Sequence, residues 1–115
     1  MPTSSSGLPL VDAHAHLYAA AFADDLDDVL ARAAEHGVQA VLCVSETLPE
    51  AQRVIELADR HPLIKPCAGL YPTILDRDAA TDMLDFIRRH RDRLAAIGEV
   101  GLDYWKVQEA ADREL

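Results

Sequence analysis

The chain has few cysteines, few basic residues and no long apolar run, and each shortage excludes a class of protein. Its 115 residues include two cysteines, Cys43 and Cys67. They stand far apart and in none of the spacings of zinc or redox sites, so we expect both to be buried as small hydrophobic side chains in a reducing compartment. No stretch approaches the roughly 18 apolar residues of a membrane helix, and the start lacks the basic and apolar segments of a signal peptide. We therefore expect a soluble intracellular protein.

Acidic residues outnumber basic ones. Lys and Arg total 11 against 20 Asp and Glu, and the formal net charge is −9. A protein that bound nucleic acid by broad electrostatic attraction would carry the opposite charge. If nucleic acid is the substrate, metal ions are therefore expected to help hold it. Half of the residues are hydrophobic, which favours a folded domain over a disordered chain.

Strand and helix patterns alternate along the chain after residues 1–8, which we expect to be a flexible leader. Strands are predicted at about residues 9–14, 38–44, 63–70 and 95–100. Helices are predicted at 22–36, from a cap at Ser45 or Thr47 to just before His61, at about 79–91, and weakly in the tail from 106 to 115. Three successive crossovers from strand to helix to strand build a parallel sheet, either doubly wound or the wall of a (β/α) barrel.

Two histidines stand one residue apart where the first predicted strand ends. Side chains two residues apart on a strand share a face, so His14 and His16 project the same way, with Asp12 on the same face. Two such imidazoles can bind one ion, at about 2.0 to 2.1 Å if it is zinc. Short histidine pairs also occur by chance on exposed strands, and the pair alone is a weak signal.

Glu99 stands near the end of the fourth predicted strand, among apolar residues. An unpaired carboxylate there would be costly. In a parallel barrel the carboxyl ends of the strands form one rim, where active sites are assembled, so Glu99 and the histidine pair would meet. A metal ion would balance the charge of Glu99, and a carboxylate that faces water or pairs with an arginine explains it equally well.

Three segments together resemble the TatD family of metal-dependent deoxyribonucleases, and within it most closely the group of TatD domain-containing protein three. They are LVDAHAHL at 10–17, GLYP at 69–72 and IGEVGLD at 97–103. The resemblance implies a TIM-type (β/α) barrel of eight strands, two divalent ions (zinc, magnesium or manganese) and hydrolysis of phosphodiester bonds in DNA. It also implies that His14 and His16 bind one ion and that Glu99 bridges both ions and takes part in catalysis.

Two positions depart from the family pattern. Tyr71 stands where the family usually has the histidine of Gly-x-His-Pro, and its phenol could still hydrogen-bond a phosphate. Tyr18 follows the first motif where many members have Asp or Asn. The resemblance implies substrate contacts for Tyr71 and Asp103. Three further histidines lie at helix ends or on helices and are expected at the surface: His36, His61 and His90.

The chain is short for such a fold, because a barrel of this kind needs about 250 residues. We therefore expect an α/β fold in which residues 9–115 form the N-terminal half of the barrel, about four βα units, incomplete at the C-terminus. The family's remaining ligands, two histidines and an aspartate on later strands, have no counterpart here. Open edges and an apolar inner face would favour self-association or a partner chain.

Two alternatives to a deoxyribonuclease stay open. The first is a metal-dependent hydrolase of another phosphoester or of an amide, because other barrel hydrolases also begin with a His-x-His pair. The second is a catalytically silent half-barrel that pairs with a partner chain.

Overall fold

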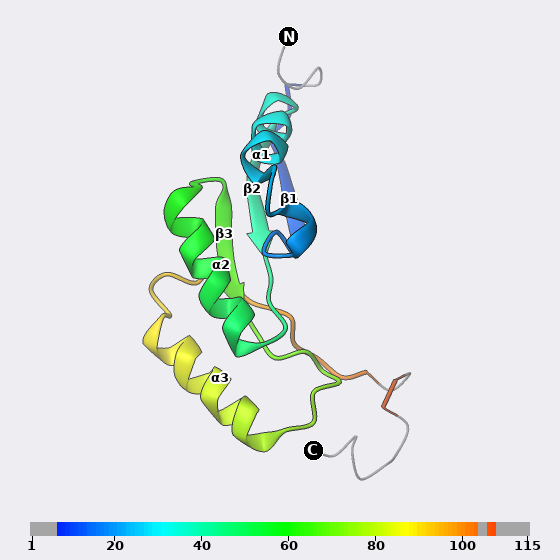
Figure 1. Cartoon of the computed structure of the whole chain (residues 1–115), viewed down its shortest axis with the longest axis vertical. Coiled ribbons are helices and arrows are strands. Elements are labelled where there is room, and N and C mark those ends of the chain that lie inside the picture. The colour runs from blue at the N-terminus through cyan, green and yellow to red at the C-terminus, as the bar shows by residue number, and fades with distance from the viewer. Residues whose placement is uncertain (1–6, 104–105, 108–115) are drawn as a thin grey trace.

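A computed structural model of the chain describes residues 7–103, 106 and 107, with strands and helices in alternation (Figure 1). Most of the predicted leader and tail lies outside these residues. The elements are β1 (Leu10–Ala15), the short 3-10 helix η1 (Ala20–Phe22), α1 (Leu26–Glu35), β2 (Val38–Cys43), α2 (Leu48–Arg60), β3 (Ile64–Ala68), α3 (Arg77–Arg89) and β4 (Ala96–Ile97). The four strands form one parallel sheet in the order β1-β2-β3-β4. The predicted α/β half-barrel is confirmed.

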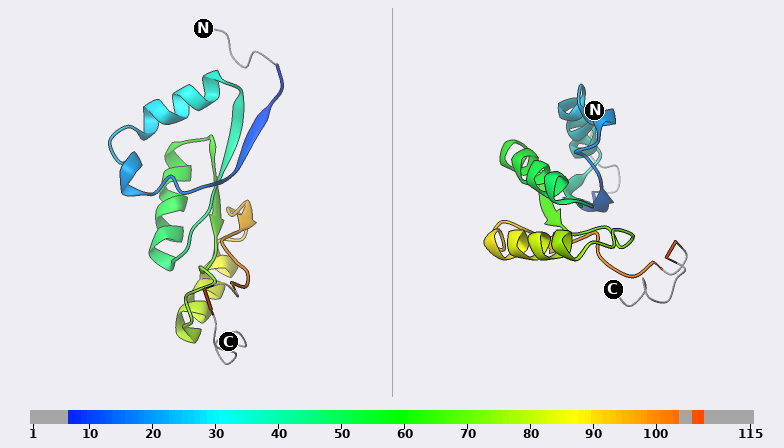
Figure 2. Two further views of the ribbon diagram at one scale, coloured as in Figure 1. Left: turned by 90° about the vertical axis from the view of Figure 1, so that its right-hand side faces the viewer. Right: turned by 60° about the horizontal axis from the view of Figure 1, so that its bottom comes forward.

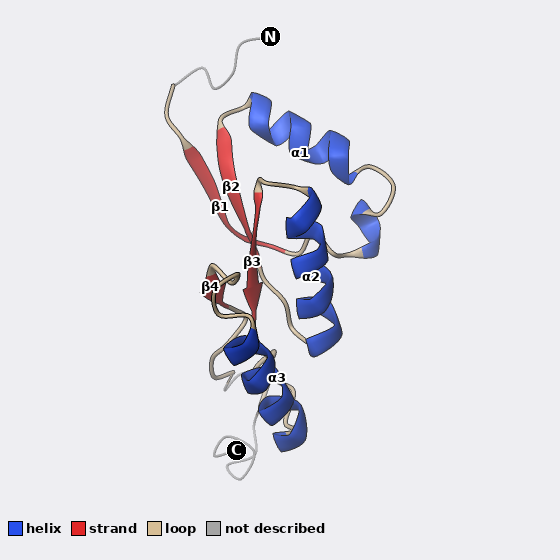
Figure 3. Cartoon of the chain, turned by 90° about the vertical axis from the view of Figure 1, so that its left-hand side faces the viewer, coloured by secondary structure: helices blue, strands red, loops and turns tan. Residues whose placement is uncertain are grey.

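The helices α1 and α2 lie on the same side of the sheet, and neither of them covers the other side (Figures 2 and 3). The molecule measures 54 × 29 × 26 Å and has a radius of gyration of 16.1 Å. A compact domain of this length would have about 13 Å. A barrel wall that has not closed on itself is less compact than a closed domain of the same length. None of the helices in the described part of the chain has the length and hydrophobicity needed to span a membrane.

Two hydrophobic clusters join the sheet to its helices. The first lies under α1 and α2 and contains Leu17, Leu30, Val41, Cys43, Val54, Leu57 and Ile64. The second lies between β3, α2 and α3 and contains Ala51, Ile55, Ala68, Met83 and Phe86. Cys43 and Cys67 are both free thiols and both buried, as predicted, and burial raises the pKa of each.

The sheet is less covered than its sequence suggests. The nearly continuous apolar run at 38–44 predicts a strand covered on both faces. On one face Val41 and Cys43 are buried under the helices, and on the other face Leu42 is partly buried and Val44 is buried. No other strand of the described chain packs against that second face. The edge strands leave large apolar side chains in solvent, with Val11 59% and Ile97 58% exposed.

Two of the helices, α2 and α3, begin after a residue whose side chain caps them. Helix α2 begins after Thr47, whose hydroxyl accepts a hydrogen bond from the Glu50 amide at 3.4 Å, and helix α3 begins after Asp76, whose carboxylate accepts from two amides. Helix α1 begins at Leu26, four residues later than predicted, behind η1 and a turn. The aspartates before Leu26 favour turns and caps over helix interiors, because their side chains compete for the backbone hydrogen bonds.

A histidine follows the last residue of each helix: His36, His61 and His90 are the C-caps of α1, α2 and α3. The ring Nδ1 of His36 and that of His90 lie 2.8 and 3.0 Å from the carbonyl oxygen four residues earlier, which also accepts the backbone amide of the same histidine. Nδ1 of His61 lies 3.5 Å from a carboxylate oxygen of Asp27. These histidines end helices and stand apart from His14 and His16.

Candidate metal centre

The chain that leaves β4 crosses over the end of β3 to reach β2. Strand β3 ends at Ala68, and the Gly98 amide donates to the Ala68 carbonyl at 3.0 Å. The next peptide pairs with Ser45 instead: Ser45 donates its amide to the Gly98 carbonyl at 3.1 Å, and Glu99 donates its amide to the Ser45 carbonyl at 2.8 Å. The predicted strand at 95–100 is therefore shortened to β4, and Glu99 is carried toward the end of β1.

This crossing requires glycine at position 69. A Cβ atom on Gly69 would lie 2.2 Å from the carbonyl oxygen of Glu99 and 2.7 Å from the carbonyl carbon of Gly98. Both neighbours are backbone atoms, so no side chain at position 69 fits unless the crossing segment moves. Ser45, which pairs with the crossing segment, is fully buried and is itself tied to β3, because its hydroxyl donates to the Cys67 carbonyl at 3.1 Å.

Three side chains converge at this point: His14 and His16 from the end of β1, and Glu99. The two Nε2 atoms lie 3.2 Å apart. The Glu99 Oε2 atom lies 3.2 Å from Nε2 of His16 and 3.7 Å from Nε2 of His14. The Glu99 side chain is 20% exposed, that of His16 32% and that of His14 56%, so the group is open to solvent on the His14 side.

The separations fit a single cation. Atoms bound at about 2.1 Å to one tetrahedral ion lie about 3.4 Å from one another. The three distances, 3.2, 3.2 and 3.7 Å, bracket that value. Two imidazole nitrogens and a carboxylate oxygen are also electron-rich atoms that need a positive charge between them, either a proton or a metal ion. Nitrogen and carboxylate donors together suit zinc, manganese or magnesium with differing preference.

Neighbouring side chains hold the two histidines. The Asp12 carboxylate accepts a hydrogen bond from the His14 amide at 3.0 Å, so Asp12 braces the backbone of β1 and does not join the group of three. The Tyr18 hydroxyl lies 2.8 Å from Nδ1 of His16, and the two rings meet edge to face. Burial, followed by the charge of Glu50 and a hydrogen bond with it, raises the pKa of the Tyr18 phenol.

Two glutamates that the sequence analysis did not single out, Glu46 and Glu50, lie beside the centre. Burial, followed by the negative charges of Glu99 and Glu50, raises the pKa of the Glu46 carboxyl. Glu46 directly follows the paired residue Ser45 at the carboxyl end of β2, and the Glu46 amide donates to Oε1 of Glu50 at 2.9 Å. The position of Glu46 at a strand end was the available signal, since the barrel rim is where functional side chains gather.

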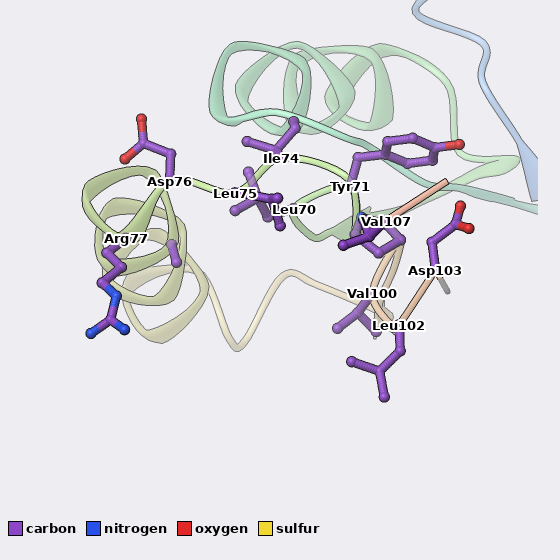
Figure 4. A pocket seen from close by; sticks show the side chains of 13 residues that line it. Leu70, Tyr71, Ile74, Leu75, Asp76, Arg77, Val100, Leu102, Asp103 and Val107 are labelled. Carbon is purple, nitrogen blue, oxygen red and sulfur yellow. The ribbon is translucent and has the colours of Figure 1, made fainter. Parts of the chain in front are cut away.

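The predicted substrate contacts, Tyr71 and Asp103, lie together at one end of a pocket of about 360 Å³ (Figure 4). Lys106 links them: its Nζ donates to the Tyr71 hydroxyl at 3.2 Å, and its amide donates to the Asp103 carboxylate at 2.9 Å. The hydrogen bond with Tyr71 raises the pKa of Lys106. The pocket walls are mostly apolar side chains: Leu70, Ile74, Leu75, Val100, Leu102 and Val107. Tyr71 and Asp103 are not among the three converging side chains.

Known proteins are similar to this chain in sequence and in fold. A mouse protein named "Putative deoxyribonuclease TATDN3" is 40% identical over 94% of this chain, and the human "Deoxyribonuclease TATDN3" is 39% identical over 87% of it. In both cases the match covers 40% of the relative's own length. The chain therefore spans well under half of the curated relatives that it matches.

A solved structure shows the same fold. The crystal structure of a hydrolase of the TatD family from Entamoeba histolytica superposes with a TM-score of 0.79 at 21% identity, over 99% of this chain and 44% of that one. The sequence profile described as "TatD related DNase" matches residues 11–114, which is nearly the whole chain. This chain belongs to the TatD family, whose members are named metal-dependent hydrolases and deoxyribonucleases.

Proposed function

We propose that the protein to which this chain belongs is a deoxyribonuclease that hydrolyses phosphodiester bonds of DNA with two divalent metal ions. The observation that carries the proposal is the convergence of His14, His16 and Glu99 at the carboxyl ends of the strands, within 4.8 Å of one another. Membership of the family and the names of the mouse and human relatives support it. Residues 9–115 would then form the N-terminal part of a longer barrel that residues 1–8 precede.

Each of the three side chains has a proposed role. His14 and His16 would hold one ion as neutral imidazoles, which leave its positive charge undiminished, and Glu99 would bridge this ion to the second. When bound, such ions supply an activated water and offset the negative charge that develops on the phosphate. The net charge of −9 on this chain repels a polyanion, and bound cations would offset that repulsion. Further ligands for the second ion would come from outside the described residues.

Tyr71 and Asp103 are proposed to bind the substrate. The Tyr71 hydroxyl and the Lys106 ammonium group lie 3.2 Å apart, so both can hydrogen-bond oxygens of the same phosphate group. Asp103 would act indirectly, because its carboxylate already accepts the Lys106 amide. The apolar pocket beside them offers room for a sugar or a base next to that phosphate.

The experiment is a hydrolysis assay of the complete, metal-depleted protein against a substrate panel, with zinc, manganese or magnesium added back. We expect cleavage of DNA oligonucleotides that a chelator stops and that one of the added cations restores. A simple phosphomonoester and an amide substrate serve as controls. Cleavage of either control in preference to DNA would favour the alternative hydrolase, and hydrolysis that persists in excess chelator would refute the metal-dependent proposal.

A half-barrel that pairs through its edges is the second candidate for the 115-residue chain itself. The observation that favours it is the exposure of Val11 on β1 and Ile97 on β4, both edge strands with apolar surface in solvent. We expect the isolated chain to sediment as a dimer or larger species and Ile97→Lys to reduce that association. Leu84→Lys, on the exposed side of α3, is the matched control and should leave it unchanged. A monomer at all concentrations would contradict this candidate.

A further inference from the structure

We propose that Tyr18 is a positioning residue that orients His16 and selects its tautomer, so that Nε2 of His16 is free to bind the metal ion. The inference rests on the metal-dependent function proposed above. It gives a role to Tyr18, which is not one of the three proposed metal ligands. It names the Tyr18 hydroxyl as the group that decides which ring nitrogen of His16 carries the proton.

The two ring nitrogens of His16 face different partners. Nδ1 lies 2.8 Å from the Tyr18 hydroxyl, whereas Nε2 lies 3.2 Å from Oε2 of Glu99 and 3.2 Å from Nε2 of His14. A neutral imidazole carries one proton, and the nitrogen without it is the metal ligand. A proton on Nδ1, donated to Tyr18, leaves the lone pair of Nε2 directed at the ion. The opposite tautomer would place a proton where the ion has to bind.

A carboxylate sets the direction of the hydrogen bonds. Glu50 is the acidic side chain whose charge and hydrogen bonding, after burial, raise the pKa of the Tyr18 phenol and keep its proton in place. A carboxylate oxygen accepts hydrogen bonds, so the Tyr18 hydroxyl would direct its proton toward Glu50, and the Tyr18 oxygen would remain free to accept from Nδ1 of His16. The resulting chain of donors runs from His16 to Tyr18 to Glu50. Outer partners of this kind orient a metal-binding histidine and raise its basicity.

The fold holds both Glu50 and Tyr18 in place. Glu50 lies in the first turn of α2, where its Oε1 accepts the Glu46 amide at 2.9 Å and its own amide donates to the capping hydroxyl of Thr47. The Tyr18 ring packs against the cluster under α1 and α2 and meets the His16 ring at 85° with 5.6 Å between centroids. A fixed helix terminus and a packed ring therefore hold the hydroxyl in place.

The test combines the tautomer of His16 with zinc affinity, both measured in the complete protein. Tyr18→Phe keeps the ring and removes the hydroxyl. We expect nitrogen NMR of the metal-free protein to show His16 protonated on Nδ1 in the wild type and divided between both nitrogens in Tyr18→Phe. Zinc affinity, measured by competition with a chelating dye, should fall by about 10- to 100-fold. The melting temperature without metal should change little, because the ring packing is retained.

Glu50 variants separate the hydrogen bond from general damage. Glu50→Gln keeps an oxygen that accepts from Tyr18 and should stay close to the wild type, whereas Glu50→Ala should move the tautomer in the direction of Tyr18→Phe without touching the ring. An Nδ1 proton and a zinc affinity that are unchanged in Tyr18→Phe would overturn the inference. A wild-type protein that binds no zinc, manganese or magnesium would instead refute the proposed function, while the tautomer in the metal-free protein would still decide the role of Tyr18.

Discussion

Replacing both His14 and His16 by alanine is expected to abolish zinc binding at this centre and metal-dependent turnover of the complete protein. The double change leaves Glu99 as the remaining member of the group of three. A single carboxylate that is 20% exposed competes poorly with water for a cation. Removing a residue that hydrogen-bonds a metal ligand lowers metal affinity by up to about 100-fold. The double variant removes two of the ligands themselves, so its zinc affinity should fall by more than that.

Stability gives an independent measurement of the same loss. A ligand that binds only the folded state stabilises it by about 2.7 kcal/mol at 100 times its dissociation constant. The wild type should therefore melt higher when zinc is added, and the double variant should not. His36→Ala with His61→Ala is the matched control, because these histidines end helices and lie apart from the centre. If the His14 and His16 double variant kept its zinc response and its turnover, the assignment of the centre would be wrong.

Gly69→Ala is expected to disrupt the centre without changing any of its three side chains. The added methyl group would meet the Glu99 carbonyl oxygen at 2.2 Å, so the segment that crosses from β4 to Ser45 has to move. Overpacking of this kind costs about 1 to 3 kcal/mol of folding free energy. Because the Glu99 amide is held by the Ser45 carbonyl, the shift should also withdraw the Glu99 carboxylate from the histidines. Urea unfolding and zinc titration measure the two effects.

Gly98→Ala provides a graded control for this prediction. A Cβ atom on Gly98 would lie 3.2 Å from a methyl carbon of the Val44 side chain, and a side-chain methyl can yield more easily than backbone. We therefore expect a smaller loss of stability and of zinc affinity than for Gly69→Ala. Equal effects from the two substitutions would show that the close approach at Gly69 is not what places Glu99.

The sequence by itself determined the repeated elements and the first half of the centre. Periodic apolar residues placed the helices to within a few residues, because burial of one face is a local pattern with a helical period. His14 and His16 were recognisable because two positions on one strand share a face whatever the rest of the fold does. The buried cysteines followed from their spacing, and the parallel sheet followed from the alternation of strand and helix.

Only the tertiary structure decided how Glu99 reaches the histidines. The sequence placed Glu99 inside a strand, whereas the structure ends β4 at Ile97 and pairs Glu99 with Ser45 across the end of β3. It also decided that the charge of Glu50 acts on the Tyr18 phenol and that Gly69 has to be glycine. These contacts join residues tens of positions apart, and they depend on where each strand stops. The residues at which strands end are set by packing between strands, and the hydrophobic period of a single segment carries no information about that packing.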